Sequence, residues 1–80
     1  MNPTIVKKGK IAFLDADRTS GRVEELDSSA NSYNPPLIYE FIEDRPLPNP
    51  IGVGILVNFI HVTTPTIPKI ARDIRMGNIG

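Results

Sequence analysis

Alternating apolar and polar positions divide this chain into short segments that favour β-strands. In residues 37–42 the side chains of Leu37, Tyr39 and Phe41 fall on one face, because successive strand residues point to opposite sides. We therefore expect Tyr39 to lie in the core beside Leu37. The same pattern, bounded by turn residues, predicts further strands at residues 9–14, 22–26 and 51–62.

Polar segments rich in turn residues separate these strands. Residues 15–21 combine Asp and Ser side chains, which bond nearby backbone, with a glycine, and this combination predicts a tight hairpin turn. Residues 27–36 and 43–50 contain prolines that interrupt strands and helices, and the first of these loops is predicted to be mobile. Residues 1–8 are expected to form a lead-in and residues 76–80 a frayed tail.

The segment 67–76 fits either a strand or a helix. Ile67, Ile70, Ala71 and Ile74 match the spacing of a helical stripe, whereas β-branched isoleucines and a short length favour a strand over residues 69–75. With a strand here, the 80 residues form a single all-β domain with its core in about residues 9–75. The predicted fold is a small five-stranded antiparallel barrel of the OB-fold type, and an SH3-like barrel is the nearest alternative.

Composition and charge limit the partners this domain can have. The chain has no cysteine, which excludes disulfides and thiolate metal sites. Its net charge is zero, but five basic and two acidic side chains lie in residues 1–22, against one basic and six acidic in residues 23–47. This segregation predicts a basic and an acidic surface, or simply a mixed solvated one.

Nothing in the sequence indicates export or a membrane. No apolar run approaches the roughly 20 residues that a membrane-spanning helix needs. The lysines near the N-terminus follow its apolar residues, which is the reverse of a secretory signal. We expect a cytoplasmic protein without a membrane partner.

Residues 9–75 resemble cold-shock domains. The first hairpin is similar to the family pattern G-x-V-K-W-F-N-x-x-K-G-F-G-F-I, with like residues at Gly9, Ile11, Phe13, Leu14, Asp15, Arg18, Gly21 and Val23. Residues 37–41, 56–59 and 70–74 then resemble, in order, the motifs V-F-V-H-F, K-V-S-F and A-A-x-N-V. The resemblance implies an OB-fold barrel that binds single-stranded RNA or DNA by stacking bases on aromatic side chains of its first three strands.

The resemblance implies a nucleic-acid-binding surface that has lost several of the family's aromatic side chains. Phe13 takes the place of the stacking tryptophan, Arg18 lies at the basic turn position, and Phe41 is the remaining aromatic of the third strand. Lys10, Arg22 and Ile38 complete the implied nucleic-acid-binding set, while Ser20 and Arg22 replace two phenylalanines and Glu40 replaces a histidine. Each lost stacking aromatic removes roughly 1–3 kcal/mol, so the implied binding is weak.

Two alternatives stay open for individual residues and for the whole domain. Phe13 is either a stacking residue or ordinary packing, and Arg22 either contacts nucleic acid or faces Glu24 or Glu40 across the sheet. The domain itself is either a nucleic-acid-binding module, chiefly for RNA, or a protein-interaction or structural barrel that has lost this activity. In the second case Ile38 and the apolar fourth strand become contact surfaces, including for a homodimer.

Catalysis and cofactors are not expected. His61 is the only histidine, and it has no cysteine or carboxylate cluster beside it in the sequence, so it predicts neither a metal site nor a catalytic base. Glu24, Glu25 and Asp27 are interpreted as a solvated turn. No phosphate-binding loop, nucleophile motif or dinucleotide fingerprint is present. We expect a non-enzymatic protein that uses no metal and no small-molecule cofactor.

Overall fold

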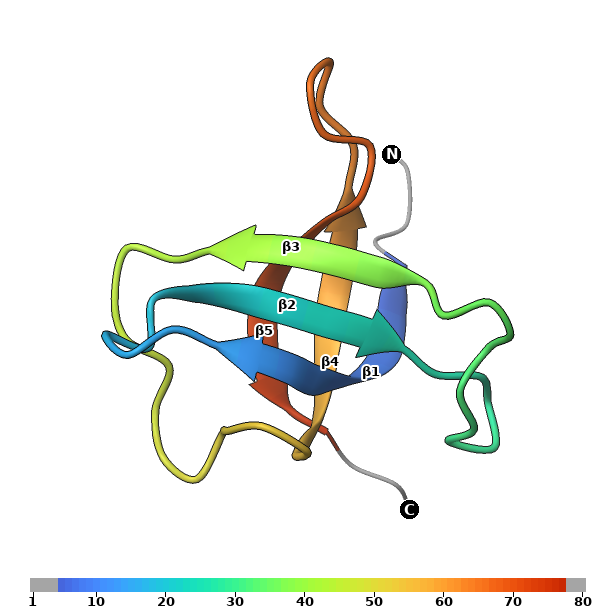
Figure 1. The fold of residues 1–80 in the computed structure, drawn as a ribbon, viewed down its shortest axis with the longest axis horizontal. Helices are drawn as coiled ribbons and strands as arrows, with labels where there is room; N and C mark the ends of the chain where they lie inside the picture. The colour runs from blue at the N-terminus through green and yellow to red at the C-terminus, as the bar shows by residue number, and fades with distance from the viewer. Residues whose placement is uncertain (1–4, 78–80) are drawn as a thin grey trace.

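Five β-strands account for the regular structure of residues 5–77, the part of the chain that the computed structural model describes (Figure 1). This range contains no helix, which confirms the all-β prediction, and so no helix there is able to span a membrane. The strands are β1 (Val6–Leu14), β2 (Ser20–Glu25), β3 (Ile38–Ile42), β4 (Leu56–Val62) and β5 (Ile70–Met76).

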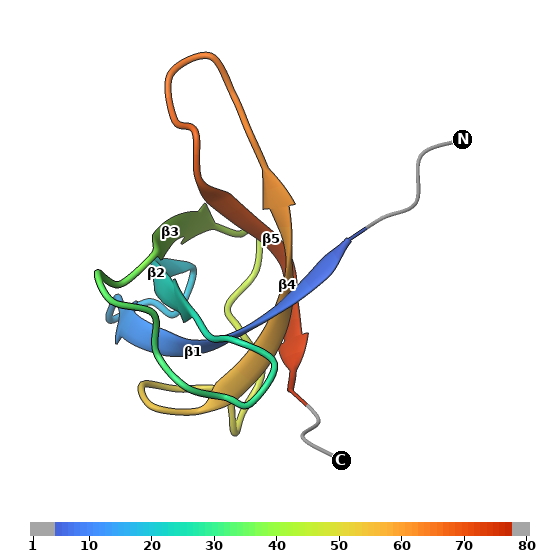
Figure 2. The same cartoon turned by 90° about the vertical axis from the view of Figure 1, so that its right-hand side faces the viewer.

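The strands close into a barrel in the order β1-β2-β3-β5-β4, as an OB-fold-like barrel requires. The long β1 strand pairs with β2 through its second half and with β4 through its first half, and Figure 2 shows it running from β2 across to β4. Four of the five strand pairs are antiparallel. The exception is β3 with β5, which run parallel and share only the pair Glu40 and Ile70. The barrel is therefore least tightly closed between β3 and β5.

Gly9 occupies the position where β1 passes from one half of the barrel to the other. It pairs with Glu25 of β2 and also with Val57 of β4. A Cβ atom at this position would lie 2.6 Å from the Glu24 carbonyl oxygen and 2.8 Å from the Phe59 ring. Only a residue without a side chain allows the strands to approach this closely.

The core consists of side chains that point inward from all five strands and from the loop before β4. They are Ile11, Val23, Tyr39, Phe41, Leu47, Ile51, Val57, Phe59, Ala71 and Ile74. In β3 the alternation is regular, so Tyr39 is buried as predicted and Phe41 is buried with it. Two β-bulges break the alternation elsewhere.

The bulges explain two features that the sequence pattern leaves open. In β1 the pairing shifts between Ile11 and Phe13, so Ile11 points into the core while Phe13, two residues later, points outward. In β5 the pairing shifts beside Asp73, whose φ is 55°, and both Ala71 and Ile74 are then buried. A spacing of three in the buried positions thus comes from a bulged strand and not from a helix.

Several predicted boundaries change in the structure. Residues 51–55, expected as the start of the fourth strand, form a turn through Gly54 at φ 86°, and Ile51 is a core residue of that loop. The expected lead-in contributes residues 6–8 to β1, and Met76, predicted as part of the tail, ends β5. Residues 78–80 of that tail lie outside the described residues.

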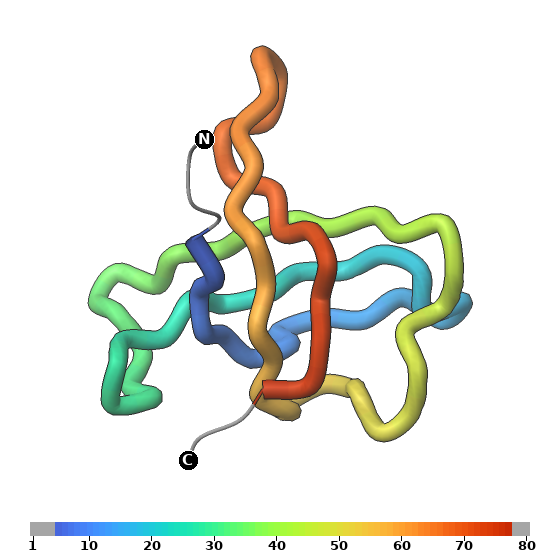
Figure 3. Tube along the Cα trace, turned by 180° about the vertical axis from the view of Figure 1, so that it is seen from behind, coloured from blue at the N-terminus to red at the C-terminus, as the bar shows by residue number. Residues whose placement is uncertain are grey.

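The loops differ in how they are held. The Asp27 carboxylate accepts hydrogen bonds from the N–H groups of Ser29 and Asn31, so the loop after β2 is locally folded; its mobility stays a prediction. The β4–β5 loop projects from the barrel, and Figure 3 shows it continuing the two strands, which lie side by side. Through Ile67, this projecting loop borders a groove on the outer face of the barrel.

Candidate nucleic-acid interface

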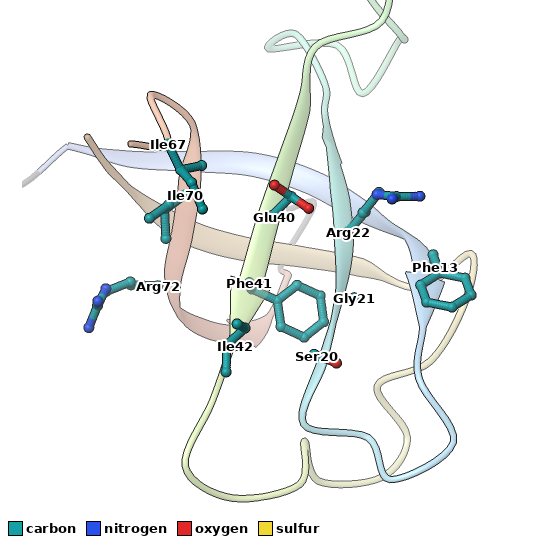
Figure 4. A pocket seen from close by; sticks show the side chains of 10 residues that line it. All are labelled: Phe13, Ser20, Gly21, Arg22, Glu40, Phe41, Ile42, Ile67, Ile70 and Arg72. Atoms are coloured by element: carbon teal, nitrogen blue, oxygen red, sulfur yellow. The ribbon is translucent and has the colours of Figure 1, made fainter. Parts of the chain in front are cut away.

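A shallow groove of about 370 Å³ lies on the outer face of the barrel, across β2 and β3 and against the start of β5 (Figure 4). The lining side chains come from four strands and the β4–β5 loop: Phe13, Ser20, Gly21, Arg22, Glu40, Phe41, Ile42, Ile67, Ile70 and Arg72. Such faces of β2 and β3 are where OB-fold barrels bind oligonucleotides and oligosaccharides. The groove is therefore the candidate site.

Strand register places four of these residues in one row across the sheet. Phe13 pairs with Arg22, Arg22 with Glu40, and Glu40 with Ile70. Adjacent strands lie about 4.8 Å apart, so the row extends over roughly 14 Å. Its order is aromatic, cationic, anionic and apolar, and Figure 4 shows the four side chains along the groove.

Phe13 and Arg22 form a cation–π pair at one end of this row. The Phe13 side chain is 52% exposed because the bulge in β1 turns it outward, and the Arg22 guanidinium carbon lies 6.0 Å from the centre of its ring. This is a cation–π arrangement at an exposed site. Aromatic rings and guanidinium planes are the two side-chain surfaces on which single-stranded bases stack.

The opposite side of the groove is formed by Ile67 and Ile70, from the β4–β5 loop and the start of β5. Side chains within the loop fix its shape: Thr64 Oγ1 donates to the Ile67 carbonyl, and His61 Nε2 lies 3.0 Å from the Pro68 carbonyl oxygen. The His61 ring also packs edge-on against Tyr39, with centroids 4.9 Å apart. His61 therefore supports the loop that borders the groove.

The structure places Phe41, predicted to contact nucleic acid, on the core side of its strand. Its side chain is only 1% exposed, and it shares the core face of β3 with Tyr39. Gly21, its partner on β2, leaves room for the ring, since a Cβ there would lie 3.0 Å from Phe41 Cζ. Phe41 lines the base of the groove from inside the barrel and cannot present a ring face to a base.

The structure also gives Arg18 a different role from the predicted phosphate contact. Its Nε donates to the Leu47 carbonyl at 3.0 Å, and an Nη donates to the Ile51 carbonyl. The Leu47 N–H in turn donates to the Arg18 carbonyl at 2.8 Å. Arg18 fastens the β3–β4 loop to the first hairpin and does not line the groove.

Lys10 and Ile38 lie outside the groove, in the neighbouring row of the sheet. Glu24 is the strand partner of both, so this row reads Lys10, Glu24 and Ile38. Ile38 is 38% exposed. Of the six residues predicted for the site, the structure brings together Phe13 and Arg22 on the outer face.

Several groove residues are not among the predicted site residues. Ile67, Ile70 and Arg72 enter because β3 and β5 are neighbours through the pair Glu40 and Ile70, which no local pattern reveals. Ile42 enters because it lies on the outer face of β3, two residues after Glu40. The burial of Phe41, in contrast, has a signal in the sequence, because Phe41 shares the strand face of Tyr39, a predicted core residue.

Glu25 is buried, which corrects its interpretation as part of a solvated turn. It is 7% exposed, accepts a hydrogen bond from the Tyr39 hydroxyl at 2.6 Å, and lies 3.4 Å from Lys7 Nζ. Burial, together with this carboxylate, raises the pKa of Tyr39 above its usual value. Glu25, Tyr39 and Lys7 lie away from the groove, and their contacts stabilise the interior of the barrel.

No group of three or more metal-ligating side chains occurs within residues 5–77. What the groove does offer is two stacking surfaces, two arginines, one carboxylate and an apolar wall. Comparison of the chain with protein-family models, curated proteins and solved structures gave no match. The chemistry of the groove side chains therefore carries the functional argument.

Proposed function

We propose that this barrel binds single-stranded nucleic acid, chiefly RNA, in the groove over β2 and β3. The observation that carries the proposal is the exposed Phe13 ring with the Arg22 guanidinium carbon 6.0 Å from its centre on that face. Both groups offer flat surfaces to unstacked bases. The resemblance of residues 9–75 to cold-shock domains supports the same face and the same ligand.

Binding through this site is expected to be weak and dependent on salt. Two stacking surfaces contribute about 2–6 kcal/mol together, whereas a micromolar Kd requires about 8 kcal/mol. Arg22 and Arg72 must add phosphate contacts, while the Glu40 carboxylate between them repels phosphate. Stacking and phosphate contacts, reduced by the repulsion from Glu40, together predict micromolar or weaker affinity.

The test is fluorescence anisotropy with labelled oligo-U and oligo-dT at about 50 and 200 mM salt. Phe13→Ala should weaken binding by about 10-fold or more, because a stacked base is lost. Tyr33→Ala is its control: Tyr33 is an exposed aromatic, 39% accessible, that does not line the groove.

Arg72→Glu tests the phosphate contacts, and Arg75→Glu is its matched control. Both residues are exposed on β5 and carry the same charge, but only Arg72 lines the groove. We expect Arg72→Glu to weaken binding and to lower the salt slope by about one, and Arg75→Glu to do neither. Equal effects from both variants would contradict the site assignment.

A protein-binding role for the same face is the second candidate. Ile42 is 83% exposed and lines the same groove as Ile67 and Ile70, so this face carries several apolar side chains. Absence of oligonucleotide binding at both salt concentrations, with a concentration-dependent mass in sedimentation, would favour this role. A homodimer is the simplest form it could take.

A further inference from the structure

We infer that Glu40 makes the groove selective for bases that present hydrogen-bond donors, and above all for guanine. The inference rests on the proposed nucleic-acid binding and names the base that the site prefers. It starts from the position of Glu40, the single carboxylate among the side chains that line the groove.

Glu40 points outward at the centre of the groove. Its neighbours in β3, Tyr39 and Phe41, are 2% and 1% exposed and point into the core, so alternation directs the Glu40 side chain to the outer face. Figure 4 shows its carboxylate between Arg22 and Ile70. The ion pairs that form within residues 5–77, Lys7 with Glu25 and Arg75 with Asp73, leave this carboxylate free.

A base stacked on Arg22 would direct one edge toward this carboxylate. Arg22 and Glu40 are cross-strand partners, so their Cα atoms are about 5 Å apart and their side chains leave the same face. This separation is less than the width of a stacked base and its hydrogen bond. The carboxylate therefore lies within reach of one edge of such a base, and we assign it the Watson–Crick edge, where the donors of guanine lie.

The chemistry of a carboxylate then decides which base is preferred. An ionised carboxylate only accepts hydrogen bonds. Guanine offers two adjacent donors, N1–H and the 2-amino group, which match both carboxylate oxygens. Cytosine and adenine offer one amino group, and uracil offers one N–H between two carbonyl oxygens that repel the carboxylate. Hydrogen bonds to a charged group are stronger than neutral ones, so guanine should be favoured over uracil by about 10-fold.

The same side chain has a second, opposite effect on affinity. Its negative charge repels the phosphates of every oligonucleotide, whatever the sequence. Replacing it by glutamine should therefore increase affinity for an all-uridine strand and, at the same time, abolish the preference for guanine. A structural role for Glu40 would produce neither effect.

The experiment measures Kd for an all-uridine oligonucleotide and for versions that carry one central guanosine or inosine, which lacks the 2-amino group. The wild-type protein should bind the guanosine strand about 10-fold more tightly than the uridine strand, with inosine between them. In Glu40→Gln the three values should converge. Glu24→Gln is the control, since it removes the same charge from the outer face of β2 outside the groove, and it should keep the preference.

The outcomes separate this inference from the proposed function. Binding that depends on Phe13 but shows no guanine preference, or a preference that persists in Glu40→Gln, would overturn the role of Glu40 alone. If the wild-type protein binds none of the three strands, both proposals are wrong.

Discussion

One added methyl group at Gly9 should destabilise the barrel strongly. A Cβ atom there would lie 2.6 Å from the Glu24 carbonyl oxygen, 2.7 Å from Val23 Cγ1 and 2.8 Å from Phe59 Cε1. The first contact is with backbone, and the other two are with core side chains that are fully buried. Relief of all three requires β1 to move away from β2 and β4, and such overpacking costs about 1–3 kcal/mol.

The expected change in Gly9→Ala is easily measured. Taking about 2 kcal/mol, Tm should fall by roughly 8–16 °C, because each kcal/mol shifts Tm by about 4–8 °C in a domain of this size. Circular dichroism during heating and urea unfolding would report it. Gly52→Ala is the matched control, since the nearest atom to its added Cβ is the Pro50 carbonyl oxygen at 3.9 Å. If both variants melt at the wild-type temperature, the argument from close approach is refuted.

Two further predictions concern Arg18, whose contacts differ from those predicted, and Tyr39, which donates a hydrogen bond to the buried Glu25 carboxylate. Arg18→Met should lower the free energy of unfolding by about 2 kcal/mol, because the Leu47 carbonyl loses a charged donor. Unchanged stability together with a shallower salt slope for oligonucleotide binding would support the predicted phosphate contact of Arg18 instead. Tyr39→Phe should be less stable than wild type near neutral pH, and the difference should shrink above about pH 10. The reason is that burial and Glu25 raise the pKa of Tyr39 in the folded state, so the stability that its hydroxyl contributes is complete below the unfolded pKa and is lost as pH rises. A stability difference between Tyr39→Phe and wild type that stays constant at high pH in urea titrations, or that Tyr33→Phe also shows, would contradict this.

The hydrophobic pattern predicts four of the strands and leaves residues 67–76 open between a strand and a helix. Alternation in residues 37–42 predicts β3 and the burial of Tyr39, and turn residues predict most of the loops. The pattern predicts a fourth strand that begins too early, at Ile51. The Ile51 side chain is apolar because it fills the core from the loop before β4.

Phe13 and Ile74 show why a strict period of two fails within a strand. Read by alternation, Phe13 shares the core face of Ile11, and Ile74 falls opposite Ala71. One extra residue in each strand reverses the phase, so Phe13 becomes an exposed stacking surface and Ile74 a core residue. Whether a bulge forms depends on the partner strand, which the local sequence does not specify.

Composition and local alternation predict four of the strands and the residues able to fill a core, because each of these is a property of short segments. For residues 67–76 the local pattern fits a helix as well as a strand, and the pairing of β5 with β4 and β3 decides for the strand. The candidate site arises only in the folded barrel. Barrel closure sets β5 beside β3, the bulge in β1 turns Phe13 outward, and cross-strand register aligns it with Arg22 and Glu40. Each of these depends on contacts between distant segments, and such contacts form only when the whole core packs.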